Sequence, residues 1–159
     1  MITPQDFTAA LASFATGVTV VTVKEGRDDI GSTVTAFTSV SLDPPLILIS
    51  VAAASYLCEV LRRRPLWAVT VLAAAQRALA GRFSAEGRPS ARLLLGGHAH
   101  HRGPKSEALI VENGIAAMEC ETRLQIPAGD HVLFVAEVLG VDYLRREDPL
   151  IRVHRRYRS

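Results

Sequence analysis

The sequence has little of several features that define large protein classes. Its 159 residues include two cysteines, one tryptophan and 6% aromatic residues, and the formal net charge is only +2. Cys58 and Cys120 lie far apart and neither belongs to a CxxC pair, so we expect free thiols rather than a zinc knuckle or a redox dithiol. No segment approaches the roughly 20 apolar residues that a membrane-spanning helix needs.

Short catalytic and nucleotide-binding motifs are also missing. The chain has no GxGxxG turn, no GxxxxGK[ST] loop, no GxSxG elbow and no HExxH helix, which argues against the usual nucleotide folds, hydrolase triads and zinc proteases. His98, His100 and His101 cluster beside two glycines. Because no cysteine or carboxylate ligand lies near them in the sequence, we interpret them as loop histidines and predict no metal site.

The charge pattern gives little indication of a partner. Two arginine clusters, residues 62–64 and the tail with Arg152, Arg155, Arg156 and Arg158, could face phosphates or could be solvated surface. The weak net charge argues against a nucleic-acid partner. The first residues show neither a basic start nor a long apolar run, so we expect no secretory signal, no membrane association and a cytoplasmic protein.

Length and composition predict one domain spanning residues 1–159. A hydrophobic fraction of 48% is enough to fill one continuous core at this size. Thr3 and Pro4 have the pattern of a helix N-cap followed by proline, and the β-branched run 18–23 favours a strand. Periodicity predicts further strands at 30–40, 46–51, 66–72, 116–126 and 131–144, helices at 56–64 (N-cap Ser55) and 73–83, and a surface excursion at 84–105.

Strands separated mostly by turns, with only short helices between them, indicate a mainly β fold with flanking helices. We therefore expect a largely antiparallel, Greek-key-like barrel with the helices packed outside it. In the predicted strand 30–40 and directly after it, hydroxyl side chains recur at Thr33, Thr35, Ser39 and Ser41. They could form a ligand-binding wall or the polar face of an edge strand, and the pattern alone leaves both open.

The segment GSTVTAFTSVSLDPPL, residues 31–46, resembles the signature of the short-chain flavin reductase family. The resemblance continues in order along nearly the whole chain. It includes Gly17–Thr22, then Leu72, Gln76, Leu79, Ala80 and Phe83, then Met118-Glu119-Cys120, Gly129-Asp130-His131 with the strand 132–138, and Pro149-Leu150 with Tyr157.

This resemblance implies an FMN-binding split β-barrel, usually a homodimer. It also implies an NAD(P)H-dependent oxidoreductase that reduces FAD or FMN and supplies the reduced flavin by diffusion to a flavin-dependent monooxygenase. Carried over by position, the flavin-binding residues would be Thr33, Val34, Thr35, Ala36, Phe37, Thr38, Ser39, Val40, Ser41, Val51, Ala52, Ser55, Phe83 and Ser84.

The family resemblance places His131 beside the nicotinamide as the one catalytic residue. Imidazole side chains can be cationic near neutral pH and could orient an anionic dinucleotide. Without the resemblance, a histidine after Gly-Asp would be interpreted as a residue that begins a strand. Arg152, His154 and Tyr157 resemble positions that close over the nicotinamide side.

One departure concerns the flavin phosphate. The family often has a basic residue shortly before the serine that matches Ser55, whereas this chain has Ala52, Ala53 and Ala54. Charge for the phosphate would then come from elsewhere, such as a tail arginine or a second subunit. Two other functions stay open: a flavin-bound oxidase of a dedicated small substrate on the same barrel, and a small nucleic-acid-binding barrel.

Overall fold

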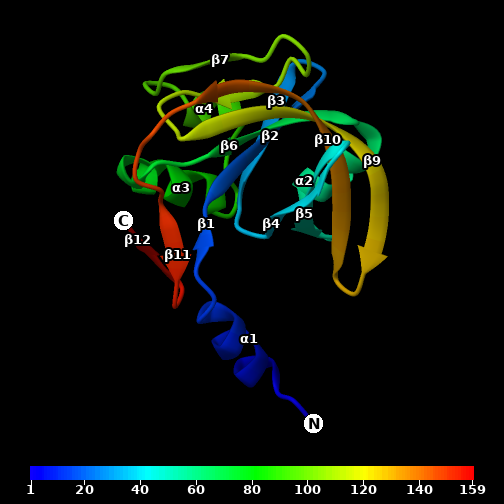
Figure 1. The fold of residues 1–159 in the computed structure, drawn as a ribbon, viewed down its shortest axis with the longest axis vertical. Helices are drawn as coiled ribbons and strands as arrows, with labels where there is room; N and C mark the ends of the chain where they lie inside the picture. Colours follow the sequence, from blue (N-terminus) through cyan, green and yellow to red (C-terminus); the bar gives the residue numbers. More distant parts are fainter.

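The structure is a computed structural model that describes residues 1–159, and its centre is an antiparallel β-sheet of seven strands. The strand order is β3-β2-β6-β9-β10-β5-β4, and every neighbouring pair is antiparallel (Figure 1). The strands are β2 (Thr19–Glu25), β3 (Asp28–Val34), β4 (Phe37–Leu42), β5 (Pro45–Ala52), β6 (Leu66–Val71), β9 (Ala116–Ala128) and β10 (His131–Leu144).

The sheet curls so that β3, at one edge, also contacts β5, the strand next to the other edge. Helix α2 (Tyr56–Arg63) packs against β2, β3 and β5. Its Leu57, Cys58, Val60 and Leu61 side chains join the core inside the curled sheet. The predicted mainly β barrel with flanking helices is confirmed.

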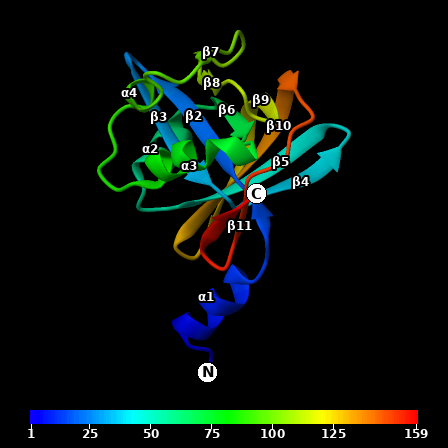
Figure 2. The same cartoon turned by 90° about the vertical axis from the view of Figure 1, so that its left-hand side faces the viewer.

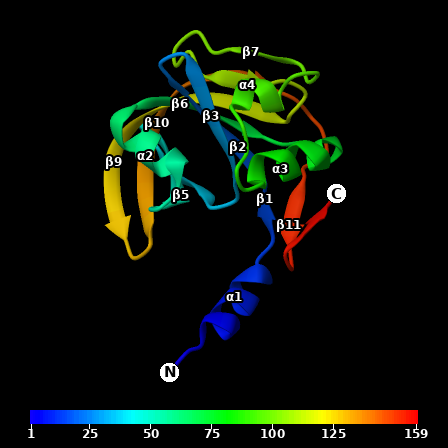
Figure 3. The ribbon, with the colours of Figure 1, turned by 180° about the vertical axis from the view of Figure 1, so that it is seen from behind.

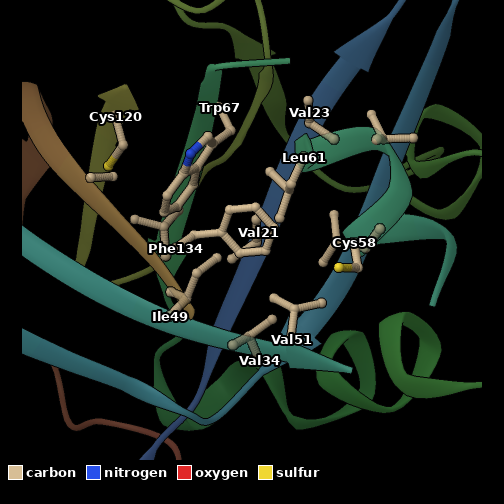
Figure 4. Close-up of a cluster of buried hydrophobic side chains, with 14 of the residues drawn as sticks. Val21, Val23, Val34, Ile49, Val51, Cys58, Leu61, Trp67, Cys120 and Phe134 are labelled. Atoms are coloured by element: carbon tan, nitrogen blue, oxygen red, sulfur yellow. The ribbon is translucent and has the colours of Figure 1, made fainter. Parts of the chain in front are cut away.

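The main core lies inside this barrel (Figure 4). Trp67, Phe134 and Ile49 are fully buried there and point toward one another from β6, β10 and β5. The one polar atom of the Trp67 ring donates a hydrogen bond of 2.9 Å from Nε1 to the Thr122 hydroxyl, which satisfies it at low cost. Both cysteines are free, as predicted, and both are buried. Burial raises the pKa of the Cys120 thiol to about 12.

Smaller elements cover the outside of the sheet (Figures 2 and 3). A second core forms where α3 packs on β3 and β2, and it contains Leu79, Ala80 and Phe83. The remaining elements are α1 (Pro4–Ala12), β1 (Thr16–Gly17), η1 (Ala74–Gln76), α3 (Arg77–Ser84), α4 (Ala91–Leu94), β7 (His100–Arg102), β8 (Leu109–Val111), β11 (Ile151–Val153) and β12 (Arg156–Arg158).

The ends of the chain form a separate small unit. Strands β1, β11 and β12 make a three-stranded sheet, which the sequence did not predict, and α1 extends from it away from the barrel (Figure 1). Thr3 caps α1 through a 3.1 Å hydrogen bond from the Asp6 amide, as expected. No residue of α1 is buried. No helix in the structure combines the length and apolar character needed to cross a bilayer.

Two predicted boundaries are wrong. The expected strand 30–40 is broken at Thr35 and Ala36, so that its two halves, β3 and β4, lie at opposite edges of the seven-stranded sheet. The expected surface excursion 84–105 holds α4 and β7, and its Ala91 and Leu95 are fully buried in the second core. Short apolar patches without a sustained period gave no sign of this anchoring.

Candidate functional site

The break between β3 and β4 borders a hollow at the seam of the barrel. The hollow has a volume of about 270 Å³. Residues from the end of β3, the end of β5, the start of α2 and the start of β10 line it. They are Ser32, Thr33, Val34, Thr35, Ala36, Ser50, Val51, Ala52, Ser55, Leu57 and His131. We call it the seam hollow.

The backbone fixes the shape of the seam hollow. The Phe37 amide donates to the Thr35 carbonyl at 3.0 Å, and the Ser50 amide donates to the Ala36 carbonyl at 3.0 Å. The first bond makes a tight turn and the second ties that turn to β5. The chain therefore leaves β3 at Thr35, passes beside β5, and returns as β4 paired with β5.

The hydroxyl groups around the hollow differ in what they can bind. Thr33 Oγ1 donates 2.7 Å to the Ala80 carbonyl, so it ties β3 to α3. Ser55 Oγ donates 2.7 Å to the Ala52 carbonyl and accepts 3.1 Å from the Cys58 amide, as an N-cap does. Thr35 and Ser50 make no side-chain hydrogen bond within the chain and are half-buried. Their hydroxyls are the ones available to a polar ligand.

His131 reaches the hollow from the first residue of β10. It pairs with Ala52 of β5 and with Ala128 of β9 across the sheet. Its Nδ1 lies 2.7 Å from Asp130 Oδ1. This hydrogen bond, together with the charge that a protonated imidazole carries, lowers the pKa of the exposed Asp130 carboxyl. Asp130 therefore holds the Nδ1 side of the ring, and Nε2 is left for a ligand.

A second hollow of about 270 Å³ lies beside the first and shares Thr35 with it. The α1 residues Phe7 and Leu11, together with Phe14, form its apolar side, and Arg152 and Arg155 supply charge. The Arg152 guanidinium lies 5.1 Å from the centre of the Tyr157 ring, a cation–π distance. His154, with a φ of 49°, occupies the turn between β11 and β12 and is exposed.

The seam hollow collects eight of the residues singled out from the sequence. They are Thr33, Val34, Thr35, Ala36, Val51, Ala52, Ser55 and His131. The structure does not bring the β4 residues Phe37, Thr38, Ser39, Val40 and Ser41 to this hollow, because β4 turns away along the sheet edge. Ser84 lies at the end of α3, with its hydroxyl bonded to the Gly81 carbonyl at 2.9 Å.

Phe83 does not line the seam hollow. Its side chain is fully buried in the second core beneath α3. The sequence also missed Ser32, Ser50 and Leu57 as lining residues. Ser50 is half-buried at the hollow because β5 alternates buried and partly exposed side chains. The apolar run 46–49 that precedes it in the sequence gave no sign of this alternation.

Comparison with known proteins places this geometry in a family. Residues 11–159 match the model of the flavin reductase like domain, so the chain belongs to that family. It is 34% identical to the reductase component of 4-hydroxyphenylacetate 3-monooxygenase from Thermus thermophilus over 152 residues, covering 96% of this chain and 93% of that protein.

Two further similarities extend the comparison. The chain is 38% identical to the NADH-dependent FMN reductase AsuE2 from Streptomyces nodosus subsp. asukaensis, covering 84% of this chain and 71% of that protein. It also resembles the solved structure of the NADH:FAD oxidoreductase SgcE6 from Streptomyces globisporus in complex with NAD and FAD fragments. That similarity has a TM-score of 0.91 at 31% identity and covers 100% of this chain and 95% of the other.

Proposed function

We propose that this protein is a flavin reductase that uses NADH or NADPH to reduce FMN or FAD and releases the reduced flavin to a separate monooxygenase. Family membership and the named relatives support the reaction class. The observation that carries the proposal is the seam hollow, where residues from four separate segments meet around one polar-edged cavity. In this proposal all 159 residues work as one flavin-binding domain.

The lining of the hollow suits the polar edge of a flavin ring. Neutral hydroxyls on Thr35 and Ser50, beside the backbone turn at Thr35–Ala36, can donate to and accept from a heterocycle. The buried side chains of Val34 and Val51 form its floor. When bound, the flavin supplies the hydride acceptor and the nicotinamide supplies the hydride. The chain holds the two rings together and needs no nucleophile of its own.

We assign His131 to the nicotinamide. It is the only titratable side chain that lines the seam hollow. With Nδ1 held by Asp130, the ring is oriented before a ligand arrives, and Nε2 can contact an amide or a phosphate oxygen. Arg152 lies in the adjoining hollow and is the tail residue best placed to assist, with Tyr157 supporting its guanidinium from one side.

We also propose a homodimer that acts in the cytoplasm. Phe7, Leu11 and Phe14 are 55%, 53% and 73% exposed on and next to a helix that touches little of its own chain. A second subunit packed on α1 would cover them. A monomeric mass across micromolar protein concentrations would contradict this assignment.

The decisive experiment follows loss of nicotinamide absorbance when purified protein is mixed with FMN or FAD and with NADH or NADPH. A flavin reductase consumes the nicotinamide with free flavin as the acceptor. Poor consumption, together with stoichiometric flavin that survives dialysis, would instead favour an oxidase of a dedicated substrate on the same fold.

The role of His131 has its own test. His131→Ala should lower kcat/KM for the nicotinamide about ten- to a hundredfold, the size of one lost positioning contact, while flavin affinity stays near that of the wild type. His100→Ala is a matched control, because His100 lies on β7 and lines neither hollow. If the His131 variant folds and keeps its nicotinamide kinetics, the assignment is wrong.

A further inference from the structure

A larger hollow continues from the seam hollow along β3. Its volume is about 640 Å³, more than twice that of the seam hollow, and the two share Ala52 and Ser55. The segment between α3 and α4 loops out beside β3 and α2 (Figure 2). Its residues 86–90 line the hollow. The lining residues are Asp28, Asp29, Ile30, Gly31, Ala52, Ala54, Ser55, Tyr56, Glu86, Gly87, Arg88, Pro89 and Ser90. We call it the loop hollow.

The two hollows follow one strand end to end. Residues 32–34 of β3 line the seam hollow, and residues 28–31 line the loop hollow. Four extended residues span roughly 13 Å. A ligand that fills the seam hollow and extends past Ser55 therefore enters a preformed space long enough for a second nucleotide-sized group.

Arg88 brings a positive charge to the place where the hollows meet. Its Nε donates 2.7 Å to the carbonyl of Gly31, the β3 residue next to the seam hollow, and one Nη donates 3.2 Å to the Ala85 carbonyl. These two carbonyls fix the guanidinium plane. The second Nη forms no hydrogen bond within the chain, and no carboxylate forms an ion pair with Arg88.

The half-buried position makes this unpaired charge unusual. The exposed Arg102, by contrast, forms an ion pair with the buried Asp29 through both of its terminal nitrogens. Burial lowers the pKa of the Arg88 guanidinium, although a guanidinium stays charged in proteins. A charge held out of water without a counterion favours an anionic ligand.

The carboxylates of the loop hollow are arranged in a compatible way. Asp29 is neutralised by Arg102. Asp28 lies three residues beyond Gly31 along β3, and Glu86 is exposed at the rim. Asp28 Oδ1 accepts a 2.8 Å hydrogen bond from the Asp29 amide, and a carboxylate in this state repels phosphate but has acceptor sites left for ribose hydroxyls. The loop hollow thus offers a cation near the seam hollow and acceptors farther away, an order that matches phosphate followed by ribose.

We propose that the loop hollow binds the adenosine half of FAD, with Arg88 paired to the pyrophosphate, so that this reductase selects FAD over FMN. The inference rests on the proposed function, because it takes the flavin ring to lie in the seam hollow. Ala52, Ala53 and Ala54 carry no charge, and Arg88 supplies a cation from another part of the chain to the hollow that Ser55 also lines.

The test is a set of fluorescence titrations of riboflavin, FMN and FAD with the apo protein. Wild type should bind FAD roughly tenfold or more tightly than FMN, and Arg88→Gln should weaken FAD binding about ten- to a hundredfold relative to riboflavin, the range of a charge-assisted hydrogen bond. Ala54→Trp, which fills the loop hollow without touching the seam hollow, should cause a similar loss for FAD. Arg82→Gln is the matched control, because Arg82 is exposed on α3 and lines neither hollow.

Several outcomes would overturn the proposal. Equal wild-type affinities for FMN and FAD would remove the adenosine site, and equal losses of both flavins in Arg88→Gln would assign Arg88 to the phosphate that FMN already carries. The nicotinamide dinucleotide also contains adenosine diphosphate. A raised KM for NADH in Arg88→Gln, with riboflavin as acceptor, would therefore give the loop hollow to that ligand instead.

The same titrations separate a wrong adenosine site from a wrong proposed function. If wild type binds riboflavin and reduces it with NADH but shows no preference for FAD, only the adenosine site is wrong. If wild type binds none of the three flavins, the proposed function itself is wrong, and the adenosine site falls with it.

Discussion

Gly31 of β3 lies close against Phe83 of α3, and its replacement by alanine gives a quantitative test of this packing. A Cβ added at Gly31 would lie 2.6 Å from Phe83 Cε1 and 3.1 Å from Phe83 Cδ1, with Ala91 Cβ at 3.2 Å. Phe83 is fully buried and cannot swing into solvent. Relief of the overlap requires α3 to shift, and overpacking of this kind costs about 1 to 3 kcal/mol.

The same helix provides a matched control. Gly81 lies within α3, and a Cβ there would meet nothing within 4 Å. Gly81→Ala should therefore raise the free energy of unfolding by about 0.5 to 1 kcal/mol, because alanine has the higher helix propensity. The two changes should therefore shift the free energy of unfolding in opposite directions. Gly31→Ala lowers it through overlap with Phe83, and Gly81→Ala raises it through helix propensity.

Urea unfolding followed by tryptophan fluorescence measures both effects, since Trp67 is fully buried in the main core. In a chain of this size a loss of 1 kcal/mol lowers Tm by roughly 2 to 4 °C, which a thermal melt also resolves. Gly31→Ala combined with Phe83→Leu should be more stable than the sum of the two single losses predicts. If Gly31→Ala is as stable as wild type, or if the double variant shows no coupling, Phe83 does not pack on β3 as described.

Two further predictions concern polar groups outside the hollows. Burial opposes protonation of His101, but hydrogen bonds with Asp142 and Glu112, each 2.9 Å, outweigh it and raise the pKa, so the folded state favours the charged ring. The stabilisation is present below the unfolded pKa of about 6.5 and is lost as pH rises through the higher folded value. His101→Gln should therefore lower Tm more at pH 6 than at pH 8.5, and a difference that grows with pH would contradict this. Glu119 is buried and one of its oxygens accepts bonds from the Lys105 amide, the Ser106 amide and the Ser106 hydroxyl. Glu119→Leu should cost about 2 to 4 kcal/mol in urea unfolding and Glu119→Gln clearly less, because only leucine leaves those donors unpaired; equal losses would refute this.

Local chemistry made much of the fold predictable. Thr3 and Ser55 were predicted as N-caps, and both accept the expected amide hydrogen bond. The strands predicted at 18–23, 116–126 and 131–144 are present as β2, β9 and β10, and the structure pairs β9 with β10. Features of this kind depend on residues within a few positions of one another, so a single sequence carries them.

The elements that the sequence did not predict depend on distant contacts. Ala91 and Leu95 are buried only because β3 and α3 already form a surface for them. Phe83 matches a ligand-contacting position by family resemblance. Its ring fits into the second core because Gly31, more than fifty residues earlier in the chain, has no side chain to occupy that space. Arg88 was likewise hidden, since its partners are the carbonyls of Gly31 and Ala85.

The break at Thr35 and Ala36 shows why the signature segment predicts the candidate site better than it predicts the fold. Periodicity treats residues 30–40 as one strand, because threonine and valine favour extended backbone on both sides of the break. In the structure the backbone turns at the break, and the two extended halves lie at opposite edges of the sheet. A continuous strand would pair its groups with a neighbour along its whole length. The interrupted strand leaves Thr35 and its backbone turn beside β5, where the barrel closes and the seam hollow opens. The polar cavity therefore lies where the sheet ladder is interrupted, and Thr35, which makes no side-chain hydrogen bond within the chain, keeps its hydroxyl available at that point.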